Sequence, residues 1–262
     1  MQLIEKDGVT LAYEDINAGL PPMLLVHGWG CDHASLDAQA EFFANSHRVV
    51  SVDLRGHGKS DGPVQDYTMA AFADDLAWLC EKLRLIKPIV IGHSMGGSIV
   101  LELAARYPDV PASIVLLNSF VFMPQAILDM QKMVLDGIRG SDYVAAYRES
   151  ISRLFLPTDE GPKKEHFLAS YPRAPQHVLT SAFVNHVTEY DGTSAAARCL
   201  VPVAHIGDVT AAISRSDLAH FQKLTPQLTL ALTLGSGHFA PLIVPDQINA
   251  MLARFVALHT AQ

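Results

Sequence analysis

Short, nearly unbroken apolar runs recur along this chain, and most of them are followed by a stretch with helical periodicity. The runs lie at residues 23–26, 48–53, 88–91 and 114–117, with a further strand-like segment at 9–14. Uninterrupted runs of this length are typical of strands buried on both faces of a parallel sheet. Apolar residues at helical spacing follow at 36–45, 68–85 and 96–107. Repeated strand and helix units of this kind predict a doubly wound α/β fold with helices on both faces.

The alternation stops between residues 119 and 197. Helix-like stretches rich in Met and Phe follow one another there without a convincing strand. The pattern then resumes as strand, helix, strand and helix at residues 201–206, 216–224, 228–234 and 245–258. We therefore expect a mainly parallel sheet formed by residues 1–118 and 198–262, with 119–197 inserted as a helical cap.

Composition excludes several classes of function. The 262 residues carry 19 Lys and Arg against 27 Asp and Glu, a net charge of −8, without a basic run that would favour nucleic acid or an anionic membrane. The charged start, Met-Gln-Leu-Ile-Glu-Lys-Asp, is unlike a signal peptide, and no stretch approaches the ~20 apolar residues of a membrane span. We expect a cytoplasmic protein. Neither the three cysteines, Cys31, Cys80 and Cys199, nor the histidines show metal-binding spacing, so no metal is expected.

The most informative motif is Gly92-His93-Ser94-Met95-Gly96. This Gly-x-Ser-x-Gly pattern stands between a predicted strand and a predicted helix, which is the setting of a nucleophile on a sharp turn. The two glycines allow close backbone packing around the turn, and the following helix directs its first amides toward the reacting atoms. The alternative is a plain glycine-rich turn at a strand end. Such a turn would not need both a strand directly before it and a helix directly after it.

A serine nucleophile needs a base within hydrogen-bonding reach and a third group that orients the base. His238 is the best candidate for the base, because it follows the last predicted strand in the glycine-flanked stretch Gly235-Ser236-Gly237-His238-Phe239. The same stretch with Ala240 matches a dinucleotide-binding pattern, but too few residues follow for a βαβ unit. We therefore expect no dinucleotide and no other cofactor.

The order of these motifs resembles the α/β-hydrolase superfamily, in its compact, capped branch of small carboxylesterases, lactonases and carbon–carbon bond hydrolases. The resemblance covers essentially the whole chain and rests on 27–30 (His-Gly-Trp-Gly), 53–60, the turn at Ser94, and Gly237-His238 with Pro245 downstream. It implies an eight-stranded sheet, Ser94 as nucleophile and His238 as base. It also implies an oxyanion hole formed by the backbone N–H groups of Trp29 and Met95, and a structural role for Asp53 and Arg55.

The triad acid departs from the family pattern. Relatives usually carry it in a Gly-x-x-Asp turn after the strand read here as 201–206, but this turn is Gly207-Asp208-Val209-Thr210. Asp208 keeps the expected chain order of serine, acid and histidine, and is our prediction. Asp217 is the alternative, although it is better explained as a charge at a helix N-terminus. Some relatives place the acid where Asn118 stands, and an amide cannot neutralise an imidazolium.

We expect the cap to set specificity and the substrate to be a small, largely apolar ester. The candidate pocket residues are Trp29, Phe122, Met123, Met130, Met133 and Phe239, all of which could equally be core. A serine carboxylesterase is our first reading. The motifs do not separate it from a carbon–carbon bond hydrolase or a perhydrolase/haloperoxidase-like enzyme. A third reading, a non-catalytic ligand receptor on the same fold, is weakened by the presence of both Ser94 and His238.

Overall fold

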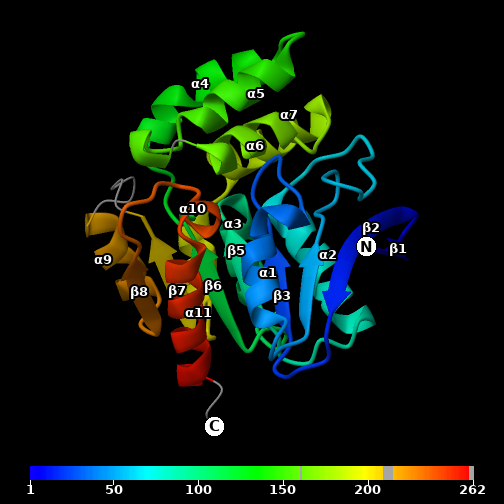
Figure 1. The fold of residues 1–262 in the computed structure, drawn as a ribbon, viewed down its shortest axis with the longest axis vertical. Helices are drawn as coiled ribbons and strands as arrows, with labels where there is room; N and C mark the ends of the chain where they lie inside the picture. The colour runs from blue at the N-terminus through cyan, green and yellow to red at the C-terminus, as the bar shows by residue number, and fades with distance from the viewer. Residues whose placement is uncertain (160, 209–214, 260–262) are drawn as a thin grey trace.

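A single eight-stranded sheet forms the centre of the computed structural model, which describes residues 1–159, 161–208 and 215–259 (Figure 1). The strands are β1 (Gln2–Lys6), β2 (Val9–Ile16), β3 (Met23–Val26), β4 (Val49–Val52), β5 (Ile89–His93), β6 (Ser113–Leu117), β7 (Val203–Gly207) and β8 (Leu228–Leu232). Their order across the sheet is β1-β2-β4-β3-β5-β6-β7-β8. The pairs from β4 to β8 are parallel, and β1 and β2 form an antiparallel edge. The structure thus confirms the predicted doubly wound, mainly parallel sheet.

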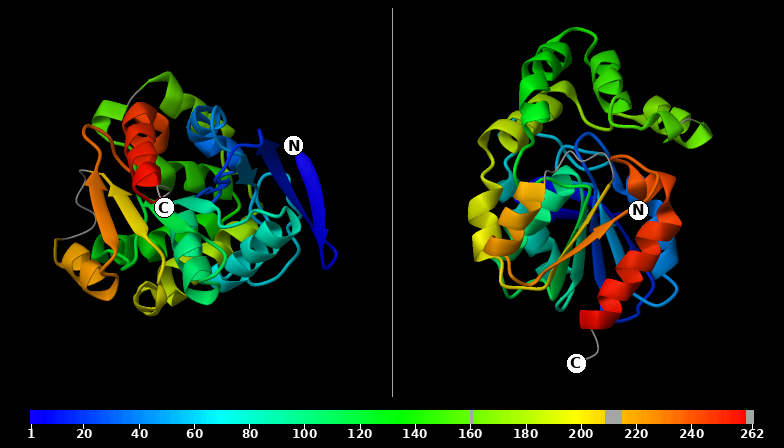
Figure 2. Two further views of the ribbon diagram at one scale, coloured as in Figure 1. Left: turned by 90° about the horizontal axis from the view of Figure 1, so that it is seen from below. Right: turned by 90° about the vertical axis from the view of Figure 1, so that its left-hand side faces the viewer.

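The interior strands are buried along their whole length because helices cover both faces of the sheet (Figure 2). In β3, Met23 and Leu25 pack with α1 (Asp37–Phe43) and α11 (Pro245–His259) on one face. The alternate residues, Leu24 and Val26, belong to the larger core cluster on the other face. The helices of that second face are α2 (Met69–Lys82), α3 (Met95–Arg106), α8 (Gly192–Arg198) and α9 (Arg215–Leu224).

The cap lies over the carboxyl ends of the parallel strands (Figures 1 and 2). Its helices are α4 (Gln125–Arg139), α5 (Tyr143–Ser152), α6 (Pro162–Ser170) and α7 (Gln176–Val184), with a 3₁₀ turn, η2 (Pro157–Asp159), and a π-helical turn, η3 (Asn185–Glu189). Two short helices, η1 (His33–Leu36) and α10 (Ala240–Ile243), lie in core loops. At the end of the predicted insertion, α8 packs on α3 of the core, and a Cβ at Gly192 would meet the Val121 carbonyl. The bounds 119–197 stay a prediction.

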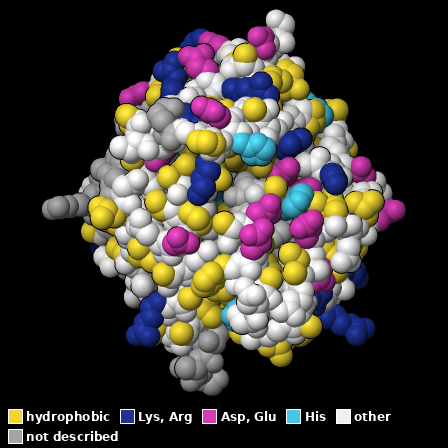
Figure 3. All heavy atoms as spheres, in the orientation of Figure 1, with side chains coloured by type: hydrophobic (Ala, Val, Ile, Leu, Met, Phe, Trp, Pro, Cys, Tyr) yellow, Lys and Arg dark blue, Asp and Glu magenta, His cyan; other side chains and the backbone are white. Residues whose placement is uncertain are grey.

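Charged side chains of both signs are spread over the face seen in Figure 3, with acidic groups gathered near its middle. Within the described residues, no helix has the length and apolar character needed to cross a lipid bilayer.

Candidate active site

Ser94 stands at a sharp turn between β5 and α3. Its backbone has φ +55° and ψ −121°, a conformation that is strained for a residue with a side chain. The flanking glycines make the turn possible: a Cβ at Gly92 would meet the Gly96 carbonyl, and one at Gly96 would meet the carbonyls of Val26 and His27. The Ser94 amide donates to the Leu117 carbonyl at 2.9 Å, which ties the turn to the end of β6. The motif therefore forms the turn that the sequence predicted.

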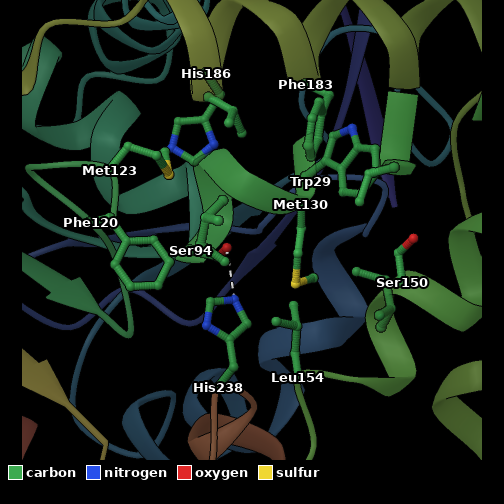
Figure 4. Close-up of a pocket in the computed structure, with 14 residues that line it drawn as sticks. Trp29, Ser94, Phe120, Met123, Met130, Ser150, Leu154, Phe183, His186 and His238 are labelled. Atoms are coloured by element: carbon green, nitrogen blue, oxygen red, sulfur yellow. Dashed lines mark hydrogen bonds between the residues drawn. The ribbon is translucent and has the colours of Figure 1, made fainter. Parts of the chain in front are cut away.

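His238 reaches Ser94 from the loop between β8 and α10. Its Nε2 lies 2.9 Å from Ser94 Oγ (Figure 4). A hydroxyl poised to lose its proton must donate, so Nε2 is the acceptor in the catalytically useful tautomer and Nδ1 carries the ring proton. The structure thus brings together the two residues that the sequence singled out as nucleophile and base.

The imidazole of His238 is held neutral by its surroundings. Burial lowers its pKa well below the ordinary 6.5, and the neighbouring His93 and His186 rings lower it further. His93 also fixes the loop, because its Nε2 lies 2.9 Å from the His238 carbonyl. A carbonyl can only accept, so His93 Nε2 is the donor. The base is therefore unprotonated, and able to take a proton, throughout the neutral pH range.

Two backbone amides lie beside the nucleophile. Met95 opens α3 directly after Ser94, and Trp29 lies in the turn after β3, where a Cβ on neighbouring Gly28 would be 3.2 Å from Ser94 Cβ. His27 braces this turn: its Nδ1 donates to the Gly28 carbonyl at 2.8 Å and its Nε2 accepts from the Leu54 amide at 3.0 Å. Among the turn, loop and cap hydrogen bonds of the described residues, none uses the Trp29 or Met95 amide. The role of these two amides as an oxyanion hole stays a prediction.

The acid position is occupied by a carboxylate and an amide from neighbouring strands. Asp208 follows β7 and accepts a hydrogen bond at 2.9 Å from Nδ2 of Asn118, which follows β6. The charge of Asp208 raises the pKa of His93 and His205 against the larger effect of their burial, which places it close to the site. Both Asp208 and His238 are described, and no hydrogen bond joins them. Asp217 lies in the first turn of α9.

Six of the residues between these two candidate acids, 209–214, lie outside the described part of the chain. The role of Asp208 therefore stays a prediction. By contrast, Asp53 has a clear structural role, because its carboxylate accepts from the amides of His33 and Lys59, each at 2.8 Å. Arg55 is engaged by Asp75 through two bonds of 2.7 Å.

Comparison with known proteins identifies the family. Residues 21–192 match the family described as the alpha/beta hydrolase fold. The chain is an α/β hydrolase. A bifunctional esterase/perhydrolase of Acinetobacter calcoaceticus is 38% identical over 118 residues, 44% of this chain and 43% of that protein. A 2-(acetamidomethylene)succinate hydrolase of Mesorhizobium japonicum is 25% identical over 95% of this chain and 92% of its own.

Among solved structures, a thermophilic esterase from Thermogutta terrifontis superposes with a TM-score of 0.86 and 27% identity, covering 99% of both chains. The chain spans less than half the length of the first curated relatives that it matches, including the Acinetobacter enzyme. Membership of this family and the similarity to esterases and other hydrolases support hydrolase activity. They do not identify the substrate.

The pocket of this hydrolase lies between Ser94 and the cap, and its space measures about 90 Å³. It is lined by Trp29, Ser94, Phe120, Met123, Ile127, Met130, Val134, Ser150, Ile151, Leu154, Phe183, His186, Val187 and His238 (Figure 4). Three of the six predicted pocket residues, Trp29, Met123 and Met130, are in this lining.

The other three predicted pocket residues are not part of this lining, and their side chains lie elsewhere. Met133 is 49% exposed on α4, and the Phe122 ring lies against His220 with ring centres 4.8 Å apart. Phe239 is buried beneath the cap, stacked on Phe155 at 4.4 Å. Three lining residues from one stretch of the cap, Phe183, His186 and Val187, were not predicted, although their helical spacing could have indicated a shared face.

The cap also holds the turn that contains Trp29 in place. The Tyr147 hydroxyl of α5 donates to the Trp29 carbonyl at 3.0 Å, and the Trp29 indole N–H donates to the Leu179 carbonyl of α7 at 2.9 Å. Tyr147 is fully buried and its ring packs on Trp29 with centres 5.0 Å apart. The orientation of the Trp29 peptide therefore depends on the cap as well as on the core.

We expect Tyr147→Phe to lower kcat by about tenfold with little change in KM, because an oxyanion donor acts in the transition state. The loss of a buried hydrogen bond should also lower the free energy of unfolding by about 1–2 kcal/mol. Steady-state kinetics and urea unfolding measure both effects. Tyr143→Phe in the same helix is the matched control, since no hydrogen bond of its hydroxyl is seen within the described residues. An unchanged kcat would contradict the assigned role.

Buried histidines should make this hydrolase sensitive to acid. Burial lowers the pKa of His57 to about 3 and those of His93 and His186 to about 4. In the unfolded chain these groups titrate near 6.5, so below that pH the unfolded state binds more protons. The contribution of these neutral, buried histidines to the free energy of unfolding is therefore complete above about pH 6.5 and is lost as the pH falls toward 4. At pH 5 each histidine should account for a loss of about 2 kcal/mol. Urea unfolding at pH 7.5 and 5.0 tests this; equal stabilities would contradict it.

Proposed function

We propose that the protein is a serine carboxylesterase acting on small, largely apolar esters through an acyl-enzyme on Ser94. The observation that carries the proposal is the 2.9 Å contact of Ser94 Oγ with His238 Nε2 at the wall of an apolar pocket. This arrangement supplies a nucleophile, its base and two nearby amide donors, which are the parts required for acyl transfer.

The reaction proceeds in two steps. Ser94 Oγ attacks the ester carbonyl carbon while its proton passes to His238 Nε2, and the carbonyl oxygen takes up negative charge beside the Trp29 and Met95 amides. The tetrahedral intermediate collapses, and the alcohol leaves with the proton from His238. Water then attacks the acyl carbon with His238 again as base, releasing the acid and restoring Ser94. Asp208 is the proposed acid that stabilises the imidazolium during both steps.

The lining of the pocket favours an uncharged and small substrate. Within the described residues, no Lys or Arg lines it. A dicarboxylate such as the succinate in the name of the Mesorhizobium relative would therefore bury its charge without a partner. The space of about 90 Å³ is well below the ~300–1,000 Å³ of pockets that hold drug-sized ligands. We therefore propose a short acyl group in the pocket.

Two measurements test the proposal. Hydrolysis of p-nitrophenyl esters of increasing acyl length should give the highest kcat/KM at two to four carbons, with a decline of about tenfold or more by ten carbons. A fluorophosphonate should inactivate the enzyme and add one mass equivalent to the peptide that contains Ser94, whereas urea-unfolded protein should remain unlabelled. An enzyme that binds the esters but neither cleaves them nor takes the label would be a receptor or a different hydrolase.

A further inference from the structure

One polar side chain in the pocket has no part in the proposed reaction. His186 lies in η3 of the cap, and in the view of Figure 4 its ring faces Ser94 from the side opposite His238. The residue is 8% exposed, and most of the residues that line the pocket are apolar. A polar group buried in such a wall is a natural determinant of which substrates the pocket accepts.

The hydrogen bonds of His186 fix which ring nitrogen carries the proton. Its Nε2 lies 3.0 Å from Ser98 Oγ, and that hydroxyl lies 3.3 Å from the Phe120 carbonyl. The carbonyl can only accept, so the single hydroxyl proton goes to Phe120 and Ser98 Oγ accepts from His186 Nε2–H. Both contacts are hydrogen bonds only in this assignment. Because burial lowers the pKa of His186 to about 4, its ring is neutral and Nδ1 carries a lone pair.

That lone pair belongs to a ring that lines the cavity. No hydrogen bond to His186 Nδ1 is found within the described residues, yet this atom is not sealed from solvent in the way that Asn118 Oδ1 and His205 Nδ1 are. The other hydrogen-bond donors of the lining, apart from Ser94 and His238, donate to backbone carbonyls of the protein. Ser150 Oγ donates to the Ala146 carbonyl at 2.8 Å and points away from the pocket in Figure 4, and the Trp29 indole donates to Leu179.

We infer that His186 Nδ1 is a specificity-determining acceptor, and that the enzyme prefers esters whose pocket-bound part carries a hydroxyl group. The inference rests on the proposed esterase function and deepens it. The small cavity favours a hydroxyl over a bulkier amide donor. A substrate hydroxyl would donate to Nδ1, whereas an apolar group of equal size would leave that acceptor buried and unpaired. The oxygen of a ketone or carboxylate at the same place can only accept a hydrogen bond, so its lone pairs would be repelled by the lone pair of His186 Nδ1.

The test compares p-nitrophenyl esters of three acids of similar size: 3-hydroxybutyrate, 3-methylbutyrate and 3-oxobutyrate. The wild-type kcat/KM should be about 10- to 100-fold higher for the hydroxy ester than for the other two. The alcohol side is examined with 2-hydroxyethyl butyrate against propyl butyrate. If the enzyme prefers a hydroxy ester over its apolar counterpart in neither comparison, the inference is overturned. A preference for the 3-oxo ester would show that Nδ1 carries the proton, and would overturn it too.

Variants locate the effect. His186→Leu should lose the preference, so that the ratio of kcat/KM for the 3-hydroxy ester to that for the 3-methyl ester falls to about one. Ser98→Ala should reduce the preference, because the proton is then no longer fixed on Nε2; this milder change also covers the case in which His186→Leu does not fold. His166→Leu, an exposed cap histidine, is the control and should keep the preference. An equal loss for all esters in His186→Leu would indicate a merely structural role.

Binding separates failure of this inference from failure of the esterase proposal. In Ser94→Ala, methyl 3-hydroxybutyrate should quench the fluorescence of Trp29 with a Kd about tenfold or more below that of methyl 3-methylbutyrate. If wild type cleaves no ester but this difference is found, the acceptor role stands and the esterase proposal fails. If esters are cleaved but the two ligands bind equally, only the acceptor role fails.

Discussion

Ser94→Ala is expected to lower kcat for p-nitrophenyl butyrate by about 10⁶-fold, the loss seen when a serine nucleophile is removed from a protease that uses the same parts. The remaining oxyanion donors and the binding site should leave about 10³-fold over the reaction in water. Initial rates at saturating ester measure the effect. Ser46→Ala, at an exposed serine, is the control and should keep full activity.

The strained backbone at position 94 adds a second readout to this prediction. Because φ is +55°, Ser94→Gly should be equally inactive but more stable than Ser94→Ala by about 1–2 kcal/mol in urea unfolding. A substantially active Ser94→Ala variant would remove the acyl-enzyme from the mechanism, even if the fold were intact.

Asp208→Asn is expected to lower kcat by about 10³- to 10⁴-fold. An asparagine can hold a neutral imidazole but cannot stabilise the imidazolium that forms when His238 takes the serine proton; the comparable change in a Ser-His-Asp protease reduces turnover by about 10⁴. Burial already lowers the pKa of His238, so this cation depends strongly on a nearby negative charge. The measurement is kcat with the same ester at pH 7.5.

Asp217→Asn is the matched comparison, because the two carboxylates flank the same loop. Asp217 lies at the start of α9, where a negative charge stabilises the helix, so its replacement should cost less than about 1 kcal/mol of stability and leave kcat unchanged. If Asp217→Asn is inactive while Asp208→Asn is active, the acid has been assigned to the wrong residue.

The core of the fold could be predicted from sequence because the interior strands are buried on both faces. In β3 and β4 every residue is buried, so the chain can use only apolar or small side chains there, and the runs are visible. The edge strand β1 was not predicted, because it is not buried on both faces. It pairs only with β2 and is largely exposed, so Gln2–Lys6 carries charged and polar residues without a clear pattern.

The placement of Ser94 beside His238 could be predicted because local backbone geometry restricts the sequence around Ser94. The turn at Ser94 requires glycines at 92 and 96, and this requirement leaves a readable motif. The pocket has no comparable signature. Whether a cap side chain such as Met130 or Met133 faces the cavity depends on how α4 rotates against its neighbours, and residues on both sides of this helix are apolar.

The cap is hydrogen-bonded both to the loop of Trp29 and to the loop of His238. Tyr147 and Leu179 hold Trp29, while the Leu154 carbonyl accepts from the His238 amide at 3.3 Å and Asp159 accepts from the Gly237 amide at 3.4 Å. Under the proposed function, the part of the chain that sets substrate preference therefore also positions Trp29 and His238. A cap transplanted from a relative would have to bring equivalent anchors for both loops, or the chimera would inherit a new binding cavity above a disarrayed nucleophile and base.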